Sequence, residues 1–139
     1  MKNALLLIAA FSLTLFGEDE KLILNGKITL QPGYVITQEA GLDSIPGVIS
    51  KENGLNIKYD IGWMSGNYLR DHSTDSGKYE FYYETKLNDK DVYIGMKKPN
   101  VLYVVFRENK KWVNFKAVVK DQKDIAEMLT ITLSYVSGK

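Results

Sequence analysis

The sequence contains no cysteine, and this absence removes several kinds of chemistry at once. The chain can form no disulfide, thiolate metal site, cysteine nucleophile or lipid attachment at a cysteine. Its stability must therefore come from buried side chains. With 139 residues, 45% of them hydrophobic and 25% charged, the chain is long enough for one globular domain with a sizeable core.

Histidine is almost as scarce, because His72 is the only one. One histidine and no cysteine leave only oxygen ligands, so calcium is the sole metal worth considering, and the acidic segment Asp71–Asp75 lacks the spacing of a calcium loop. The glycines at Gly62 and Gly66 are not followed by the Lys-Ser/Thr pair of a phosphate loop. The sequence therefore predicts neither a metal nor a cofactor.

The longest run of apolar residues lies near the N-terminus. Lys2 is followed by the apolar run Ala4–Phe16, then by Gly17 and the acidic cluster Glu18–Glu20. A positive start, about a dozen apolar residues and a small residue before polar sequence are typical of a secretory signal. The run is short of the roughly 20 residues that cross a bilayer, and a core helix is the alternative. We expect residues 1–17 to be a signal peptide, residues 18–139 to be the exported domain, and its location to be the periplasm or the extracellular space.

An excess of charge of one sign is also lacking. Of the 18 basic residues only Lys2 lies in the predicted signal, and none of the 17 acidic residues does, so the exported domain has a formal net charge of zero. Binding to nucleic acid or to an anionic membrane usually needs a clustered basic face. We therefore expect no nucleic acid partner and no stable membrane anchor once the signal is removed.

Strand patterns fill most of the remaining sequence. Along Leu55–Ile61 apolar residues alternate with polar ones, which predicts a strand with one buried and one solvated face. Asn25-Gly26 favours a hairpin within Leu22–Leu30, although a single bent strand also fits. Further strands are predicted at Tyr34–Gln38, Gly47–Ser50, Tyr79–Leu87, Asp91–Lys97, Val101–Arg107 and Trp112–Val119.

The last four of these strands are joined by short polar turns, which predicts an antiparallel meander. The period then changes, and apolar residues between Asp121 and Tyr135 form one stripe of an α-helix with Asp121 as its N-cap. The second half of this segment, Leu129–Val136, also fits a strand. We predict an α+β fold in which an antiparallel sheet of about six to eight strands carries one C-terminal helix. A small closed β-barrel with an appended helix is the alternative.

The stretch Gly41–Tyr68 is the least regular part of the chain. The polar run Ser65–Lys78, which overlaps its end, is the longest predicted loop. Long loops in compact domains are usually functional or disordered. Tyr79, Phe81 and Tyr83 are predicted to share one face of the following strand, with Tyr82 on the other. The residues that we single out for ligand binding around this loop are Asp60, Trp63, Tyr68, Arg70, His72 and Tyr82.

Three functions are compatible with this pattern. The leading prediction is an exported, non-enzymatic module that binds a small ligand or a protein through its aromatic, glycine-rich region, because tyrosine and tryptophan are enriched at interfaces. The second is a small hydrolase that uses Asp60 with His72 or Ser44. The third is a structural or assembly factor of a larger envelope complex. The sequence does not predict the oligomeric state.

Overall fold

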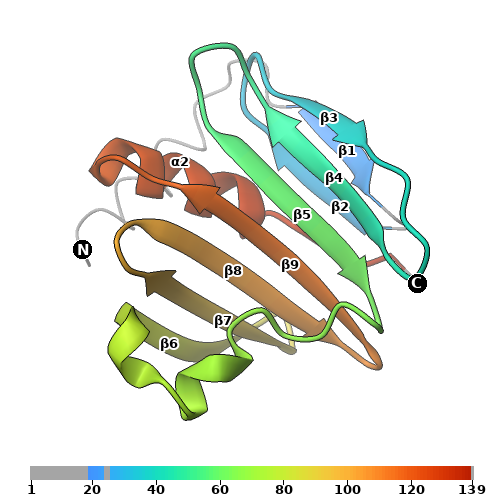
Figure 1. The fold of residues 1–139 in the computed structure, drawn as a ribbon. Helices are drawn as coiled ribbons and strands as arrows, with labels where there is room; N and C mark the ends of the chain where they lie inside the picture. Colours follow the sequence, from blue (N-terminus) through green and yellow to red (C-terminus); the bar gives the residue numbers. More distant parts are fainter. Residues whose placement is uncertain (1–18, 24–25, 139) are drawn as a thin grey trace.

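The computed structural model describes residues 19–23 and 26–138. The predicted signal peptide lies outside these residues. The body of the fold is an antiparallel sheet of seven strands in the order β3-β4-β5-β9-β8-β7-β6 (Figure 1). Its strands are β3 (Val35–Gln38), β4 (Ile45–Ser50), β5 (Asn56–Gly62), β6 (Tyr79–Leu87), β7 (Lys90–Lys97), β8 (Val101–Glu108) and β9 (Lys111–Val118).

Two further elements lie outside this sheet. A separate antiparallel hairpin consists of β1 (Asp19–Ile23) and β2 (Gly26–Leu30). Helix α2 (Gln122–Thr132) follows β9 and packs against both β2 and β8. The backbones of Lys27 and Val136 exchange two hydrogen bonds of 2.8 Å, which tie the segment after the helix to the hairpin.

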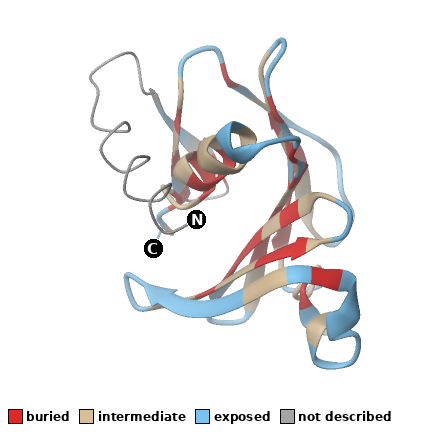
Figure 2. Ribbon diagram, turned by 90° about the vertical axis from the view of Figure 1, so that its left-hand side faces the viewer, coloured by how far each residue is buried: buried red, intermediate tan, exposed pale blue. Residues whose placement is uncertain are grey.

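The main core lies between the sheet and the layer formed by α2 and the hairpin. Alternate residues of β5 point into it, and Ile57 and Ile61 are completely buried. Ile28 of the hairpin and Met128 of the helix are also completely buried and close the core from the other side. Figure 2 shows buried residues concentrated where α2 faces the sheet. We call the sheet face toward α2 the inner face and the opposite one the outer face.

The helix begins where the sequence predicts. Asp121 has extended backbone angles, and its Oδ1 accepts the backbone N–H of Asp124 at 2.9 Å. The Asp124 carboxylate in turn accepts the backbone N–H of Lys120 at 2.8 Å. The first of these bonds satisfies a donor that the first helical turn leaves without a partner, and the second holds the residue before the N-cap.

The structure confirms the α+β fold with an antiparallel sheet and a C-terminal helix. The closed barrel is wrong, because among the described strands β3 and β6 form the two edges of the sheet. The bent-strand alternative for Leu22–Leu30 is wrong as well, because β1 and β2 form a hairpin. The strand alternative for Leu129–Val136 is wrong for residues 129–132, because the helix continues to Thr132.

One predicted face assignment is also wrong. The pairing of β6 with β7 shifts register between Tyr79 and Phe81. This β-bulge inserts Glu80 and reverses the alternation of side chains before it. Tyr79 therefore packs with Tyr82 on the outer face, whereas Phe81 packs against the main core.

Candidate functional site

The outer face of the sheet carries the features that can bind another molecule. Residues that pair directly across strands point to the same face, so Tyr93, Val105 and Asn114 share this face on β7, β8 and β9. The connection from Trp63 to Lys78 crosses it and contains two short 3-10 helices, η1 (Arg70–Ser73) and η2 (Ser76–Lys78). We call this connection the crossing loop.

A single asparagine fixes the first half of the crossing loop. Asn114 is completely buried in the middle of β9. Its Oδ1 accepts the backbone N–H of Tyr68 at 3.0 Å, and its Nδ2 donates to the carbonyl of Gly66 at 2.8 Å. The side chain thus makes the hydrogen bonds that a neighbouring strand would make, and it holds the loop to the sheet.

The Tyr68 side chain forms a second attachment. Its hydroxyl donates to Asp60 Oδ2 at 2.6 Å, and burial together with this bond raises the pKa of Tyr68 well above its usual value. The other carboxylate oxygen of Asp60 is buried and has no hydrogen-bond partner among the described residues. The ammonium group of Lys116 lies 5.8 Å from the centre of the Tyr68 ring.

The second half of the loop is held by Asp71. Its carboxylate accepts hydrogen bonds from the hydroxyl of Tyr79 and, at 3.3 Å, from Lys97 Nζ. The bond from Tyr79 is the main cause that lowers the pKa of Asp71, and the charges of Lys97 and Lys78 add to it against an opposing effect of burial. Lys97 also donates to the carbonyl of Tyr68 at 3.1 Å, so it links both halves of the loop to β7.

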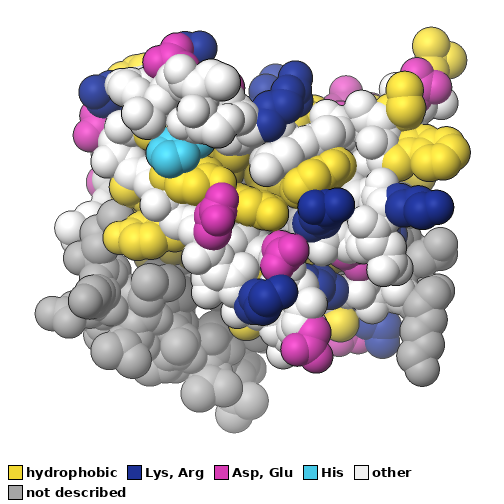
Figure 3. All heavy atoms as spheres, turned by 90° about the horizontal axis from the view of Figure 1, so that it is seen from below, with side chains coloured by type: hydrophobic (Ala, Val, Ile, Leu, Met, Phe, Trp, Pro, Cys, Tyr) yellow, Lys and Arg dark blue, Asp and Glu magenta, His cyan; other side chains and the backbone are white. Residues whose placement is uncertain are grey.

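Aromatic side chains of the crossing loop and of strands β6, β7 and β9 share the outer face. We define the aromatic band as His72, Tyr82, Tyr93 and Trp112. The rings of His72 and Tyr82 are stacked with centroids 3.8 Å apart, and those of Tyr93 and Trp112 are 5.9 Å apart. Each of the four is partly exposed. Figure 3 shows apolar groups extending across this face from the histidine, with acidic and basic side chains between and beside them.

Charged groups border the band. The Tyr82 hydroxyl donates to Glu84 at 2.7 Å, and Glu84 is the strand partner of Tyr93. The guanidinium of Arg107 lies 5.3 Å from the Trp112 ring, on the directly opposite position of β8. A partly buried aromatic centre within a polar, solvated rim is the usual composition of a protein interface.

At the end of β5, three large apolar side chains are exposed. Trp63 is 70% exposed, Met64 67% and Leu42 fully. A cavity of about 450 Å³ lies beside Trp63 and is also lined by Lys110 and Lys111 of the β8–β9 turn. Trp63 follows Gly62, which is the strand partner of Trp112, and its cavity is also lined by Glu108 and Ser137.

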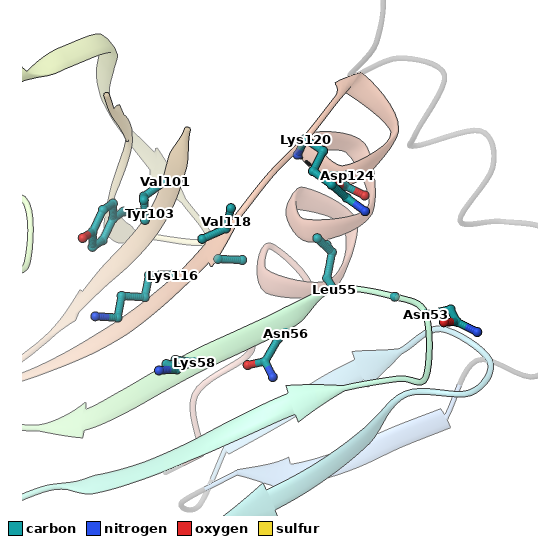
Figure 4. Close-up of a pocket in the computed structure, with 12 residues that line it drawn as sticks. Asn53, Leu55, Asn56, Lys58, Val101, Tyr103, Lys116, Val118, Lys120 and Asp124 are labelled. Atoms are coloured by element: carbon teal, nitrogen blue, oxygen red, sulfur yellow. Dashed lines mark hydrogen bonds between the residues drawn. The ribbon is translucent and has the colours of Figure 1, made fainter. Parts of the chain in front are cut away.

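A larger cavity, of about 550 Å³, lies at the opposite end of the same strands, near the start of α2. Figure 4 shows Lys58, Lys116 and Tyr103 projecting from β5, β9 and β8 in the same direction, with Lys120 just before α2 and Asp124 in its first turn. We call this the lysine cavity. The full lining is Asn53, Gly54, Leu55, Asn56, Lys58, Val101, Tyr103, Lys116, Ala117, Val118, Lys120 and Asp124.

The structure places the six residues predicted from the sequence in several separate contacts. Asp60 and Tyr68 bond to each other, and His72 stacks on Tyr82. Arg70 is exposed and donates to the carbonyl of Asn67 at 3.2 Å. Whether they bind a ligand stays a prediction.

Sequence reasoning missed Asn114, Tyr93 and Trp112. A signal for Asn114 was present, because it is the one strictly polar, uncharged residue among the apolar positions of β9. Tyr93 and Trp112 carried no such signal, since aromatic residues are frequent in any strand. They become neighbours on the outer face because β7, β8 and β9 lie side by side in the sheet.

Neither a metal centre nor a membrane-spanning helix is found in residues 19–23 and 26–138. Among the described residues, no three His, Asp or Glu side chains come together as metal ligands. No helix within that part of the chain has the length and apolar character needed to cross a bilayer.

The fold defines the chain as an α+β protein with a seven-stranded antiparallel sheet and one C-terminal helix. No family model matches the sequence, and no curated protein does. The fold resembles the solution structure of cyanobacterial PsbP (CyanoP) from Synechocystis sp. PCC 6803, with a TM-score of 0.60 over 90% of this chain and 95% of that one. The two sequences are 10% identical, so the likeness establishes the fold and nothing more.

Proposed function

We propose that the protein is an exported, non-enzymatic interaction module that binds a protein partner through the aromatic band. The observation that carries this proposal is the band itself, in which His72, Tyr82, Tyr93 and Trp112 are partly exposed on one face. Tyrosine and tryptophan dominate the energetics of protein interfaces because they bury large areas with little loss of side-chain entropy.

The support of the band is as important as its composition. The crossing loop that carries His72 is held by Asn114 and Asp71, and its hydrogen bonds run to β9, β7 and β6. A surface whose side chains are already fixed loses less conformational entropy when a partner binds. This support distinguishes the band from a set of loose surface tyrosines.

The hydrogen bonds give the hydrolase alternative little support. A nucleophile needs a base within hydrogen-bond reach and a third group that orients that base. Among the described residues, no hydrogen bond joins Asp60, His72 and Ser44 to one another, and Asp60 is instead bonded to Tyr68. The assembly-factor alternative differs in its surface as well as its partner, because the helix face or a sheet edge would dock on a larger complex.

The test is a comparison of two tyrosines on one strand. Tyr82 lies in the band, whereas Tyr83 is 57% exposed and points to the other face of β6. Affinity purification from the exported fraction of the native host is compared for the wild type, Tyr82→Ala, Trp112→Ala and Tyr83→Ala. A partner should be recovered with the wild type and with Tyr83→Ala, and it should be lost with the two band variants. Recovery of every partner with Tyr82→Ala and Trp112→Ala would refute the proposal.

A further inference from the structure

We propose that the lysine cavity binds a small organic anion, whose acidic group is held by Lys58 and Lys116 and whose apolar body lies on Val101 and Val118. The acidic group is a carboxylate, sulfonate or phosphate ester. This site lies at the opposite end of β5 and β9 from Trp63, and none of the described residues that line it belongs to the aromatic band.

Two lysines lie side by side at the cavity. Lys58 and Lys116 are direct strand partners on β5 and β9, so their side chains leave the same face side by side. Like charges at directly opposite positions of a sheet destabilise it. An anion bound between the two ammonium groups would relieve this repulsion and receive hydrogen bonds from both.

The charged groups that line the cavity are mostly lysines. None of the ion pairs among the described residues includes Lys58, Lys116 or Lys120. Of the described residues, Asp124 is the one acid that lines the cavity, and its carboxylate accepts the backbone N–H of Lys120 just before α2. Asp60, the nearest acid along β5, is bonded to Tyr68. The charge balance of the cavity is therefore positive.

An apolar surface lies next to the lysines. Val101 and Val118 are direct strand partners on β8 and β9, and Val118 is 60% exposed. Tyr103 and Lys116 form the neighbouring pair of the same two strands. Two adjacent cross-strand rows thus differ in character. The row of Lys58, Lys116 and Tyr103 is cationic and contains a tyrosine, whereas the row of Val118 and Val101 is apolar. A ligand that spans both rows needs an acidic group joined to a hydrocarbon or aromatic body.

The size of the cavity agrees with such a ligand. Its volume of about 550 Å³ lies within the range of roughly 300–1,000 Å³ that is usual for small-molecule sites. An inorganic anion alone would fill only a small part of it and would leave the valines exposed. The predicted preference is therefore for an organic anion over phosphate.

The probe for the test is 8-anilinonaphthalene-1-sulfonate, which joins a sulfonate to aromatic rings and fluoresces when it leaves water. We expect saturable binding to the folded domain, with ¹⁵N chemical-shift changes centred on Val118 and Tyr103. Replacing one lysine, as in Lys58→Gln or Lys116→Gln, should weaken binding about tenfold, the effect of losing one hydrogen bond to a charged group. The control Lys110→Gln removes the same charge from the exposed β8–β9 turn and should leave binding unchanged.

Two further arms separate the acidic group from the apolar body. N-phenyl-1-naphthylamine has the same rings without the sulfonate and should bind far more weakly. Inorganic phosphate should displace the probe only at much higher concentration than the probe's own Kd. Unchanged binding in the Lys58→Gln/Lys116→Gln double variant, equal binding of the uncharged analogue, or phosphate binding as tight as the probe would each overturn the proposal. Loss of partner binding in the aromatic-band variants would leave this result unaffected.

Discussion

Asn114 and Tyr68 are 46 residues apart in the sequence, yet the amide of one accepts the backbone N–H of the other at 3.0 Å. Through this bond, a buried side chain in the middle of the sheet determines where the crossing loop lies. Tyr68 in turn bonds Asp60 and presents its carbonyl to Lys97. One uncharged polar residue therefore fixes the first half of the crossing loop on the outer face.

We expect Asn114→Leu to release the first half of the crossing loop while the sheet stays folded. Leucine has a similar volume, but the Tyr68 N–H and the Gly66 carbonyl would lose their partners. The expected loss in the free energy of unfolding is about 2 kcal/mol, measured by urea denaturation. Tryptic cleavage after Arg70, which lies in this loop, should become faster. Asn56→Ala, at an exposed position of β5, serves as the control, and an equal effect there would contradict the role of Asn114.

Gly47→Ala tests how tightly the inner face is packed at the β4–β5 pair. A Cβ at Gly47 would lie 2.2 Å from the Tyr59 hydroxyl and ring, and Tyr59 is its direct strand partner. Because Tyr59 is 3% exposed, its ring has little space to move, and we expect destabilisation of about 1–3 kcal/mol in urea denaturation. Gly77→Ala is the matched control, since the nearest atom to its Cβ would be 4.0 Å away. A change there should stay within about 0.5 kcal/mol.

Much of the fold follows from short-range pattern. The turns at Asn88–Asp89 and Asn109 have positive φ, which asparagine and aspartate tolerate, so the meander from β6 to β9 could be predicted strand by strand. Asp121 marks the start of α2 because it can accept the backbone N–H of Asp124. These features depend on residues a few positions apart.

The strand order could not be predicted in the same way. β9 pairs with β5, and it thereby separates β5 from β6, which follows it in the sequence. The pairing depends on which apolar faces meet in the finished core, and many strands here carry equivalent faces. The candidate site shares this limit, because Asp60 and Asn114, which both bond Tyr68, become strand partners only through that pairing. Tyr79 shows a second limit, since a bulge at Glu80 reversed its expected face.

Asp71 predicts how stability depends on pH. Its pKa is lowered in the folded protein, chiefly by the hydrogen bond from Tyr79. In the unfolded chain, the pKa of an aspartate is about 3.9. The stability that its charge contributes is fully present above that value and is lost as the pH falls through the lower, folded pKa. Asp71→Asn should therefore be less stable than the wild type at pH 7 in urea denaturation, and the difference should shrink below about pH 4.

Salt and a second aspartate provide the controls for this effect. The Asp71 side chain is 31% exposed, so solvent screens its attraction to Lys97 and the difference at pH 7 should decrease in high salt. Asp75→Asn removes a more exposed carboxylate that pairs only with Lys78 among the described residues, and it should change stability less. A difference between wild type and Asp71→Asn that is the same at pH 7 and pH 3 would show that the charge is not responsible.

Export can be tested on the N-terminal segment directly. When the full chain is expressed in a Gram-negative host, we expect the periplasmic form to lack residues 1–17 and to begin at Glu18 by intact mass. Leu6→Arg should keep the protein uncleaved in the cytoplasm, because a charge interrupts the apolar run that the secretion machinery recognises. Lys21→Gln changes a charge just after the proposed cleavage site and should be exported normally. Full-length protein in the periplasm would instead indicate that the segment is retained, and cleavage elsewhere would move the start of the exported domain without affecting the case for export.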